Sequence, residues 1–180
     1  TCQWGDHKVW WYIFLTQGRV HIEVLPEGWS QHEGQAMVVA MLPGILKKML
    51  GRDATYPDHT FTDRGPGYYH PSSGTINPEY LAALEANGFK AWAGEHSKWQ
   101  PPDLADVLLH ETVVSWVRKY LKQHPIHLTS SMPRNITRLK DLLEEAVSHI
   151  NTYYEVEDLC HSLPRRLSEL KDGEGERLKY

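Results

Sequence analysis

The 180-residue sequence has only two cysteines, Cys2 and Cys160, which lie far apart. They lack the paired C-x-x-C spacing of a zinc site and are too few for a disulfide scaffold, so we expect free thiols. The sequence also lacks the roughly 18 uninterrupted apolar residues of a membrane-spanning helix and the basic-then-apolar order of a signal peptide. These absences predict an intracellular protein with no membrane partner.

A surplus of basic residues is missing as well. The formal net charge is −4, whereas binding to phosphate groups usually requires an excess of lysine and arginine. An acidic catalytic face, together with a basic domain outside this sequence, would also give this balance. What the sequence does contain is enough apolar and aromatic side chains, 41% and 11% of its residues, to fill a hydrophobic core.

The first regular structure that the sequence predicts is a β-hairpin. Residues 8–16 and 19–25 are rich in β-branched and aromatic side chains, and Gln17-Gly18 between them favours a turn. Apolar and polar residues alternate in the second strand, which predicts one buried face. The buried positions would be Val20, Ile22 and Val24.

Helices and short strands are expected in the rest of the chain. A helix should run from a capping box at Ser30 to Gly51, with Pro43 inside it. Asn77-Pro78 is typical of an N-cap followed by the first helical position. Strands are expected at 59–63 and 89–92, and helices at 79–87, 103–122, 135–154 and 156–171, the last with a restart near Pro164. This succession of strands and helices predicts an α/β fold.

Two carboxylates are candidates for catalysis. Asp63 ends a predicted strand just before a glycine- and proline-rich turn, which is where α/β sheets hold their ligands. Glu111 lies in the predicted helix 103–122, where the helical wheel places it beside apolar residues rather than on the open face. Asp103 and Asp106 could supply the second acid instead, or could cap the helix. Asp63 could also be an ordinary turn residue, and Glu111 an ordinary helix glutamate.

This order of elements resembles the DDE catalytic domain of mariner-type transposases. The resemblance covers residues 9–121 and rests on the hairpin, the helix and the strand that ends at Asp63. These are followed by the segment Trp99-Gln100-Pro101-Pro102-Asp103-Leu104, which leads to Glu111 and Trp116. In that family the second catalytic aspartate closes a strand, and the last acidic residue follows a proline-rich Asp-Leu segment and precedes a tryptophan.

The resemblance implies an RNase H-like fold and metal-dependent cleavage and transfer of DNA strands. Asp63 and Glu111 would be the second and third catalytic acids and would bind Mg²⁺ or Mn²⁺, since two-metal sites use carboxylate oxygens around cations about 3.5–4 Å apart. DNA would be the partner, and the protein could form a homodimer. It would be nuclear in a eukaryotic host. Arg64, Tyr68 and Lys98 would contact DNA, although each could equally be a packing residue.

The predicted domain organisation places a partial RNase H-like domain at residues 1–124 and a helical extension that packs on it at 125–180. The first catalytic aspartate, its strand and a helix-turn-helix domain would precede residue 1, because Asp6 is too close to the next strand to serve. The fragment alone would then be catalytically incomplete.

Three other interpretations stay open. The chain could be a decayed or domesticated transposase remnant that acts as a binding or structural module, or a different nuclease on the same fold. The eleven histidines raise the question of a zinc site, but His59, His70, His96 and His110 lack ligand spacing such as H-E-x-x-H.

Overall fold

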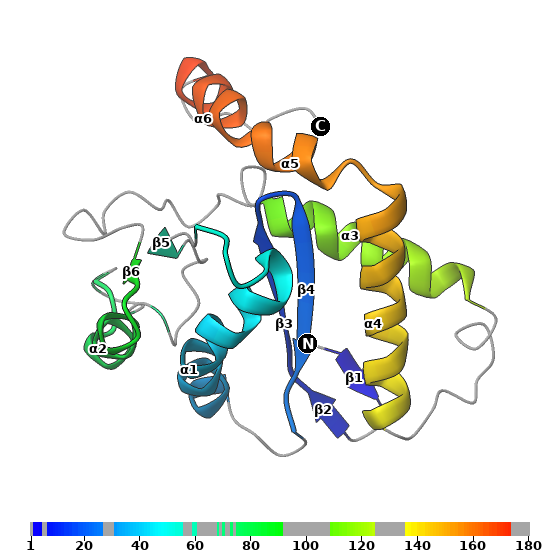
Figure 1. The fold of residues 1–180 in the computed structure, drawn as a ribbon, viewed down its shortest axis with the longest axis horizontal. Coiled ribbons are helices and arrows are strands. Elements are labelled where there is room, and N and C mark those ends of the chain that lie inside the picture. Colours follow the sequence, from blue (N-terminus) through cyan, green and yellow to red (C-terminus); the bar gives the residue numbers. More distant parts are fainter. Residues whose placement is uncertain are drawn as a thin grey trace. The chain divides into compact units, whose positions relative to one another are not determined.

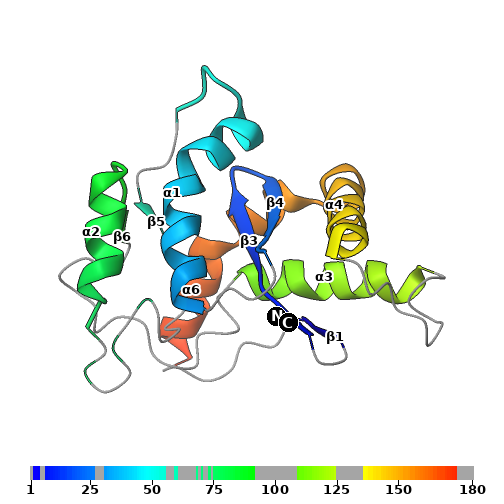
Figure 2. The ribbon, with the colours of Figure 1, turned by 90° about the horizontal axis from the view of Figure 1, so that it is seen from below.

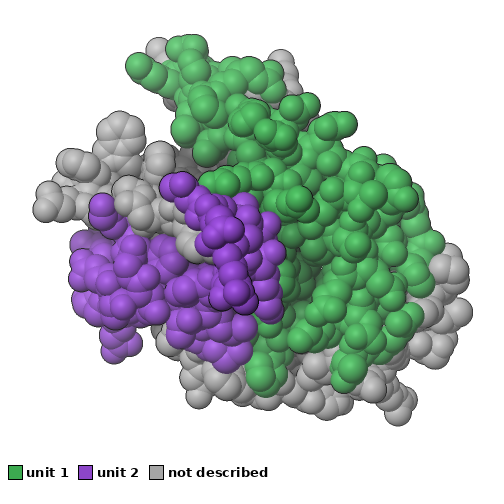
Figure 3. All heavy atoms as spheres, in the orientation of Figure 1, with its two compact units in different colours: residues 1–28, 105–180 green, residues 29–104 purple. Residues whose placement is uncertain are grey.

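The computed structural model describes residues 2–4, 7–26, 31–55, 59–60, 68, 70, 73, 75–91, 109–124 and 136–173. They form a mixed α/β structure, as the sequence predicts. The chain divides into two compact units, residues 1–28 with 105–180 and residues 29–104 (Figure 3). Each unit has a hydrophobic core of its own. The sequence-based partition near residue 124 stays a prediction.

The first unit is built on the predicted hairpin. Strands β3 (Trp11–Thr16) and β4 (Arg19–Val24) pair antiparallel, with Ile13 opposite Ile22. A shorter antiparallel pair, β1 (Cys2–Trp4) with β2 (His7–Val9), precedes it. The predicted alternation in β4 is confirmed, because Val20, Ile22 and Val24 are buried.

The two residues between β3 and β4 form a tight turn. Gln17 and Gly18 have φ angles of 45° and 73°. Two consecutive positive φ values are characteristic of a type I′ turn, whose twist matches that of the flanking strands. Glycine adopts this region without a Cβ clash, which is why Gln17-Gly18 is a good turn sequence.

In the part of the first unit that the structure describes, the helices are α3 (Leu109–Gln123), α4 (Ile136–Tyr153), α5 (Val156–His161) and α6 (Leu163–Asp172). Helices α3 and α4 pack on each other and on the hairpin, α3 beside β3 and α4 beside β4 (Figures 1 and 2). The predicted helix at 135–154 and the restart near Pro164 are confirmed. The predicted start of α3 at 103 lies outside the described residues. The core that these elements share contains Val20, Ile22, Val24, Val113, Val117, Leu139, Leu143, Ala146, Val147, Ile150, Val156 and Leu159.

The described residues of the second unit form helices α1 and α2 and a short parallel sheet. Helix α1 (Gln31–Leu50) ends at Gly51, whose φ is 90° and whose N–H donates to the Lys47 carbonyl at 3.0 Å. This confirms the predicted C-terminal glycine. Pro43 lies inside α1 without ending it, and Ser30 is outside the described residues.

The remaining elements form a strand–helix–strand segment. Strands β5 (His59–Thr60) and β6 (Lys90–Ala91) pair in parallel, and α2 (Pro78–Ala86) lies between them in sequence. Asn77 is the N-cap of α2, as predicted, and its Oδ1 accepts from the Glu79 N–H at 3.0 Å. Residues 61–63 and 92, the ends of the predicted strands, lie outside the described residues. The core of this unit contains Val39, Leu46, Tyr80, Leu84 and Phe89.

Among the described residues, no helix combines the length and the apolar character needed to cross a bilayer.

Candidate functional site

The parallel pair β5–β6 defines an edge where ligands bind in α/β proteins. Parallel strands need a crossover connection, and α2 lies within the segment that supplies it. Both strands therefore end on the same side of the sheet, and ligands of open α/β sheets bind beyond such carboxyl ends. Asp63 follows the last residue of β5 by three positions, but Asp63 itself lies outside the described residues.

Glu111 lies in the first turn of α3, in the other unit. Its side chain is 54% exposed, and its Oε1 lies 3.6 Å from His110 Nε2. The expectation that Glu111 avoids the open face is therefore wrong. The buried stripe of α3 runs through Val113 and Val117, and helical geometry turns Glu111 away from that stripe. An exposed carboxylate is available to a cation from solvent, which suits a ligand of Mg²⁺ or Mn²⁺.

The other predicted site residues are only partly covered by the structure. Arg64, Lys98, Asp103 and Asp106 lie outside the described residues. Tyr68 is described and half-buried, and its ring meets that of Tyr80 edge-on at a centroid distance of 4.9 Å. Tyr68 therefore packs in the second unit, which is the alternative that its sequence context left open. Its role in DNA binding stays a prediction.

Within the ranges that the structure describes, no group of three or more histidine, cysteine, aspartate or glutamate side chains could hold a metal ion. Asp63, one of the two predicted metal ligands, is not among these residues.

The sequence analysis missed a group of aromatic side chains between α3 and α4. Trp116 and Tyr154 have ring centroids 4.7 Å apart, and Tyr120 and His149 are 5.0 Å apart. His149 continues the series to Tyr153, at 4.8 Å. We call these five residues the aromatic row. Their four-residue spacing, 116 to 120 in one helix and 149 to 153 in the next, is the signal that could have identified them.

Charged side chains follow the same pair of helices. The Glu145 carboxylate lies near two basic side chains, with Arg138 Nη1 at 3.6 Å and His124 Nε2 at 3.8 Å. Lys140 pairs with Glu144 at 4.0 Å one turn along α4. The exposed charges of α4 are thus largely balanced, as expected for a solvated helix face. In contrast, residues 112–123 of α3 contain Arg118, Lys119 and Lys122 and no acidic residue.

Comparisons with models of protein families, with curated proteins and with solved structures found no match to this chain.

Proposed function

We propose that the chain forms part of a metal-dependent enzyme that cleaves and transfers DNA strands, with an RNase H-like catalytic domain of the DDE transposase type. The observation that carries this proposal is the order and pairing of the described elements. An antiparallel hairpin, β3–β4, is followed by α1, by the parallel pair β5–β6 with α2 between, and by α3. This is the succession that the resemblance to mariner-type transposases implies.

Two carboxylates, Asp63 and Glu111, are the metal ligands that the proposal assigns. Asp63 comes three residues after the end of β5 in sequence, and Glu111 lies in the first turn of α3. Bound Mg²⁺ or Mn²⁺ would activate the attacking oxygen and stabilise the leaving oxygen of a phosphodiester. Asp63 and Glu111 would hold the cations through their hard oxygen atoms. Hydrolysis by water gives a nick, and attack by a 3′-hydroxyl joins two strands.

The direct test is Mn²⁺ binding to the 180-residue chain, measured from the electron paramagnetic resonance signal of free Mn²⁺. Asp63→Asn and Glu111→Gln should each weaken binding at least about tenfold, because each removes one charged ligand from the site. Glu79→Gln is the matched control, since Glu79 is also an exposed glutamate in the first turn of a helix. Equal binding by all four proteins would overturn the shared metal site.

Cleavage is tested in the natural protein that carries this sequence. Nicking of supercoiled plasmid should require Mg²⁺ or Mn²⁺ and should be lost in Asp63→Asn and Glu111→Gln. Joined products would indicate strand transfer, and nicks alone would indicate a nuclease on the same fold.

A second candidate function is the non-catalytic remnant that keeps the fold for binding or assembly. The exposure of Glu111 and its pairing with His110 favour it, because an ordinary helix surface has the same features. Wild-type protein that binds neither Mn²⁺ nor Mg²⁺ would select this function over the first.

A further inference from the structure

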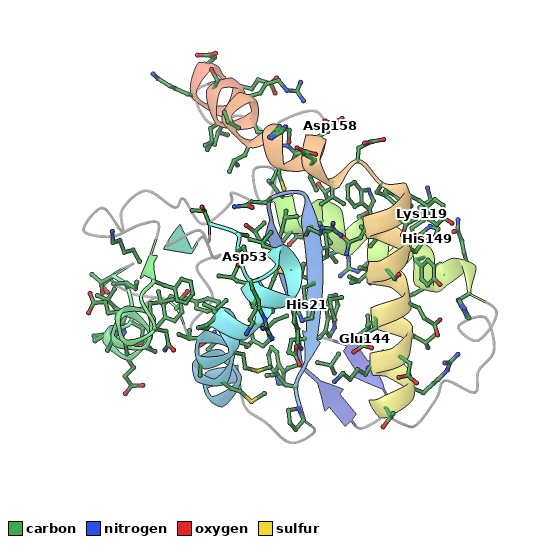
Figure 4. The ribbon with its side chains drawn as sticks, viewed as in Figure 1. His21, Asp53, Lys119, Glu144, His149 and Asp158 are labelled. Atoms are coloured by element: carbon green, nitrogen blue, oxygen red, sulfur yellow. The ribbon has the colours of Figure 1, made fainter. Side chains whose placement is uncertain are left out.

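Helix α6 has the features of a segment that opens at low cost. All ten of its residues are described, and none of them is buried. Its main contact with another described element is with the short helix α5, and its N-cap residue, Ser162, makes no side-chain capping hydrogen bond. Figure 4 shows α6 beyond Asp158 of α5, with side chains on several sides of the helix. Helices with few buried contacts unfold locally more readily than the core, so a partner protein can reach the opened chain.

The two serines of this region differ in what their hydroxyl groups do. Ser162 Oγ donates to the Leu159 carbonyl at 2.6 Å and accepts from Arg166 Nε at 3.0 Å, so it holds the junction between α5 and α6. Ser168 is exposed, and its Oγ lies 3.5 Å from Asp172 Oδ2, which is longer than an ordinary O–H···O hydrogen bond. The Ser168 hydroxyl therefore contributes little to the fold and is accessible to a reagent in solution.

Two arginines, Arg165 and Arg166, lie three and two residues before Ser168. Of all the serines and threonines in the sequence, Ser168 alone has a basic residue at both of these positions. In the helix Arg165 lies one turn before Ser168 on the same side, and its side chain is 63% exposed, whereas Arg166 points in another direction. A partner that binds both arginines and the serine at once must therefore bind α6 in an opened, extended form.

We propose that Ser168 is a phosphorylation site for a serine kinase whose peptide-binding groove carries acidic side chains. A guanidinium donates two parallel hydrogen bonds to a carboxylate, so two arginines at this spacing select an acidic groove, and kinases distinguish substrates by such charge patterns. Ser168 Oγ attacks the γ-phosphorus of ATP, and the bond from that phosphorus to the bridging oxygen breaks. ADP leaves, and the hydroxyl proton passes to the catalytic aspartate of the kinase. The site uses neither Asp63 nor Glu111, so it does not rest on the proposed function.

The phosphate would reverse the net charge of α6. Three basic and two acidic side chains give the helix a charge of +1. A phosphoserine adds a charge of about −1.5 to −2 at pH 7, which makes the helix negative. Arg165, which lies 3.4 Å from Glu169, is also one turn from Ser168 and can donate to the phosphate instead. Phosphorylation is thus an electrostatic change confined to this helix.

The test incubates the 180-residue chain with Mg²⁺, ATP and the catalytic subunit of cAMP-dependent protein kinase, used as a probe with arginine-directed specificity. Mass spectrometry of peptides should locate the phosphate on Ser168. Arg165→Gln and Arg166→Gln should each lower the rate about tenfold or more, because each removes a charge-assisted hydrogen-bonded pair. Thr55→Ala is the matched control: Thr55 is exposed and has a single arginine, Arg52, three residues before it, so its loss should leave the rate unchanged.

A synthetic peptide of residues 161–174 separates recognition from folding. The intact chain should be phosphorylated within about a hundredfold of the peptide rate, since opening α6 exposes no buried side chain. The two arginine variants should slow the peptide as they slow the chain, which places their effect in recognition rather than in the fold. Phosphate on Thr55 in place of Ser168 would overturn the proposal. A chain that stays unmodified while the peptide reacts, or a peptide that does not react, would overturn it as well.

Discussion

Asn151 joins helix α4 to strand β4 through the oxygen and the nitrogen of its side-chain amide. Its Oδ1 accepts from the Val20 N–H at 2.9 Å, and its Nδ2 donates to the Val20 carbonyl at 2.9 Å. The side chain thereby satisfies both main-chain groups of one residue in β4, as a neighbouring strand would. Val20 is buried, so these groups would be costly to leave without partners.

Replacing Asn151 by alanine should destabilise the first unit by about 1–3 kcal/mol, since it leaves the Val20 N–H and carbonyl without their partner. Urea unfolding followed by tryptophan fluorescence measures the change. Thr152→Ala is the control: Thr152 is exposed, and its hydroxyl donates only to the Ser148 carbonyl of its own helix, so its effect should stay within about 0.5 kcal/mol. An Asn151→Ala variant with unchanged stability would show that water replaces the side-chain amide as the hydrogen-bond partner of Val20.

At the scale of elements, the hairpin turn is fitted against helix α5. A Cβ on Gly18 would lie 3.0 Å from the Cβ of Glu157 and 3.2 Å from its Cα. The Cys160 thiol is also close to this turn. Burial raises the pKa of that thiol, while a hydrogen bond involving the Gly18 backbone lowers it and the Glu157 charge raises it. Two features therefore favour glycine at position 18: its φ of 73°, and the Glu157 atoms that a Cβ would meet.

Gly18→Ala should destabilise the first unit by about 1–3 kcal/mol, because the alanine is strained at positive φ and meets the backbone of α5. Gly44→Ala is the opposite case. Gly44 lies inside α1, a Cβ there meets nothing within 4 Å, and alanine should stabilise the helix by about 0.5–1 kcal/mol. Thermal unfolding of both variants measures the change in stability, which should be a loss for Gly18→Ala and a gain for Gly44→Ala. A stabilising Gly18→Ala would contradict the turn geometry.

At the scale of the whole molecule, the described residues form two hydrophobic cores that share no residue. Leu143 is fully buried in the first, among residues of the hairpin, α3, α4 and α5. Leu84 is fully buried in the second, together with Val39, Tyr80 and Phe89. The peptide segments that form each core are therefore expected to open as separate cooperative units.

Leu84→Ala and Leu143→Ala should each cost about 2–5 kcal/mol, the range for removing a buried leucine side chain. Hydrogen exchange followed by mass spectrometry should show faster exchange in residues 29–104 for Leu84→Ala. For Leu143→Ala the acceleration should fall in residues 1–28 and 105–180. Acceleration in both units for either variant would show that they unfold together.

The amino-acid sequence by itself determined the local structure. Gln17-Gly18 predicted the hairpin turn, Asn77-Pro78 the start of α2, and Gly51 the end of α1, because each depends on the dihedral preferences or side-chain hydrogen bonds of one or two residues. The alternation in β4 predicted its buried face for the same kind of local reason. Asp63 and Glu111 came from motif order, and their pairing stays a prediction.

Only the tertiary structure decided which distant residues meet. Asn151 and Val20 are 131 positions apart, and no periodicity connects them. The exposure of Glu111 depends on which face of α3 packs against the core, and its neighbours in sequence suggested the wrong face. The aromatic row likewise exists because α3 and α4 cross where Tyr120 meets His149. Sequence patterns report the periodicity of one element, whereas contacts between elements depend on how the whole core packs.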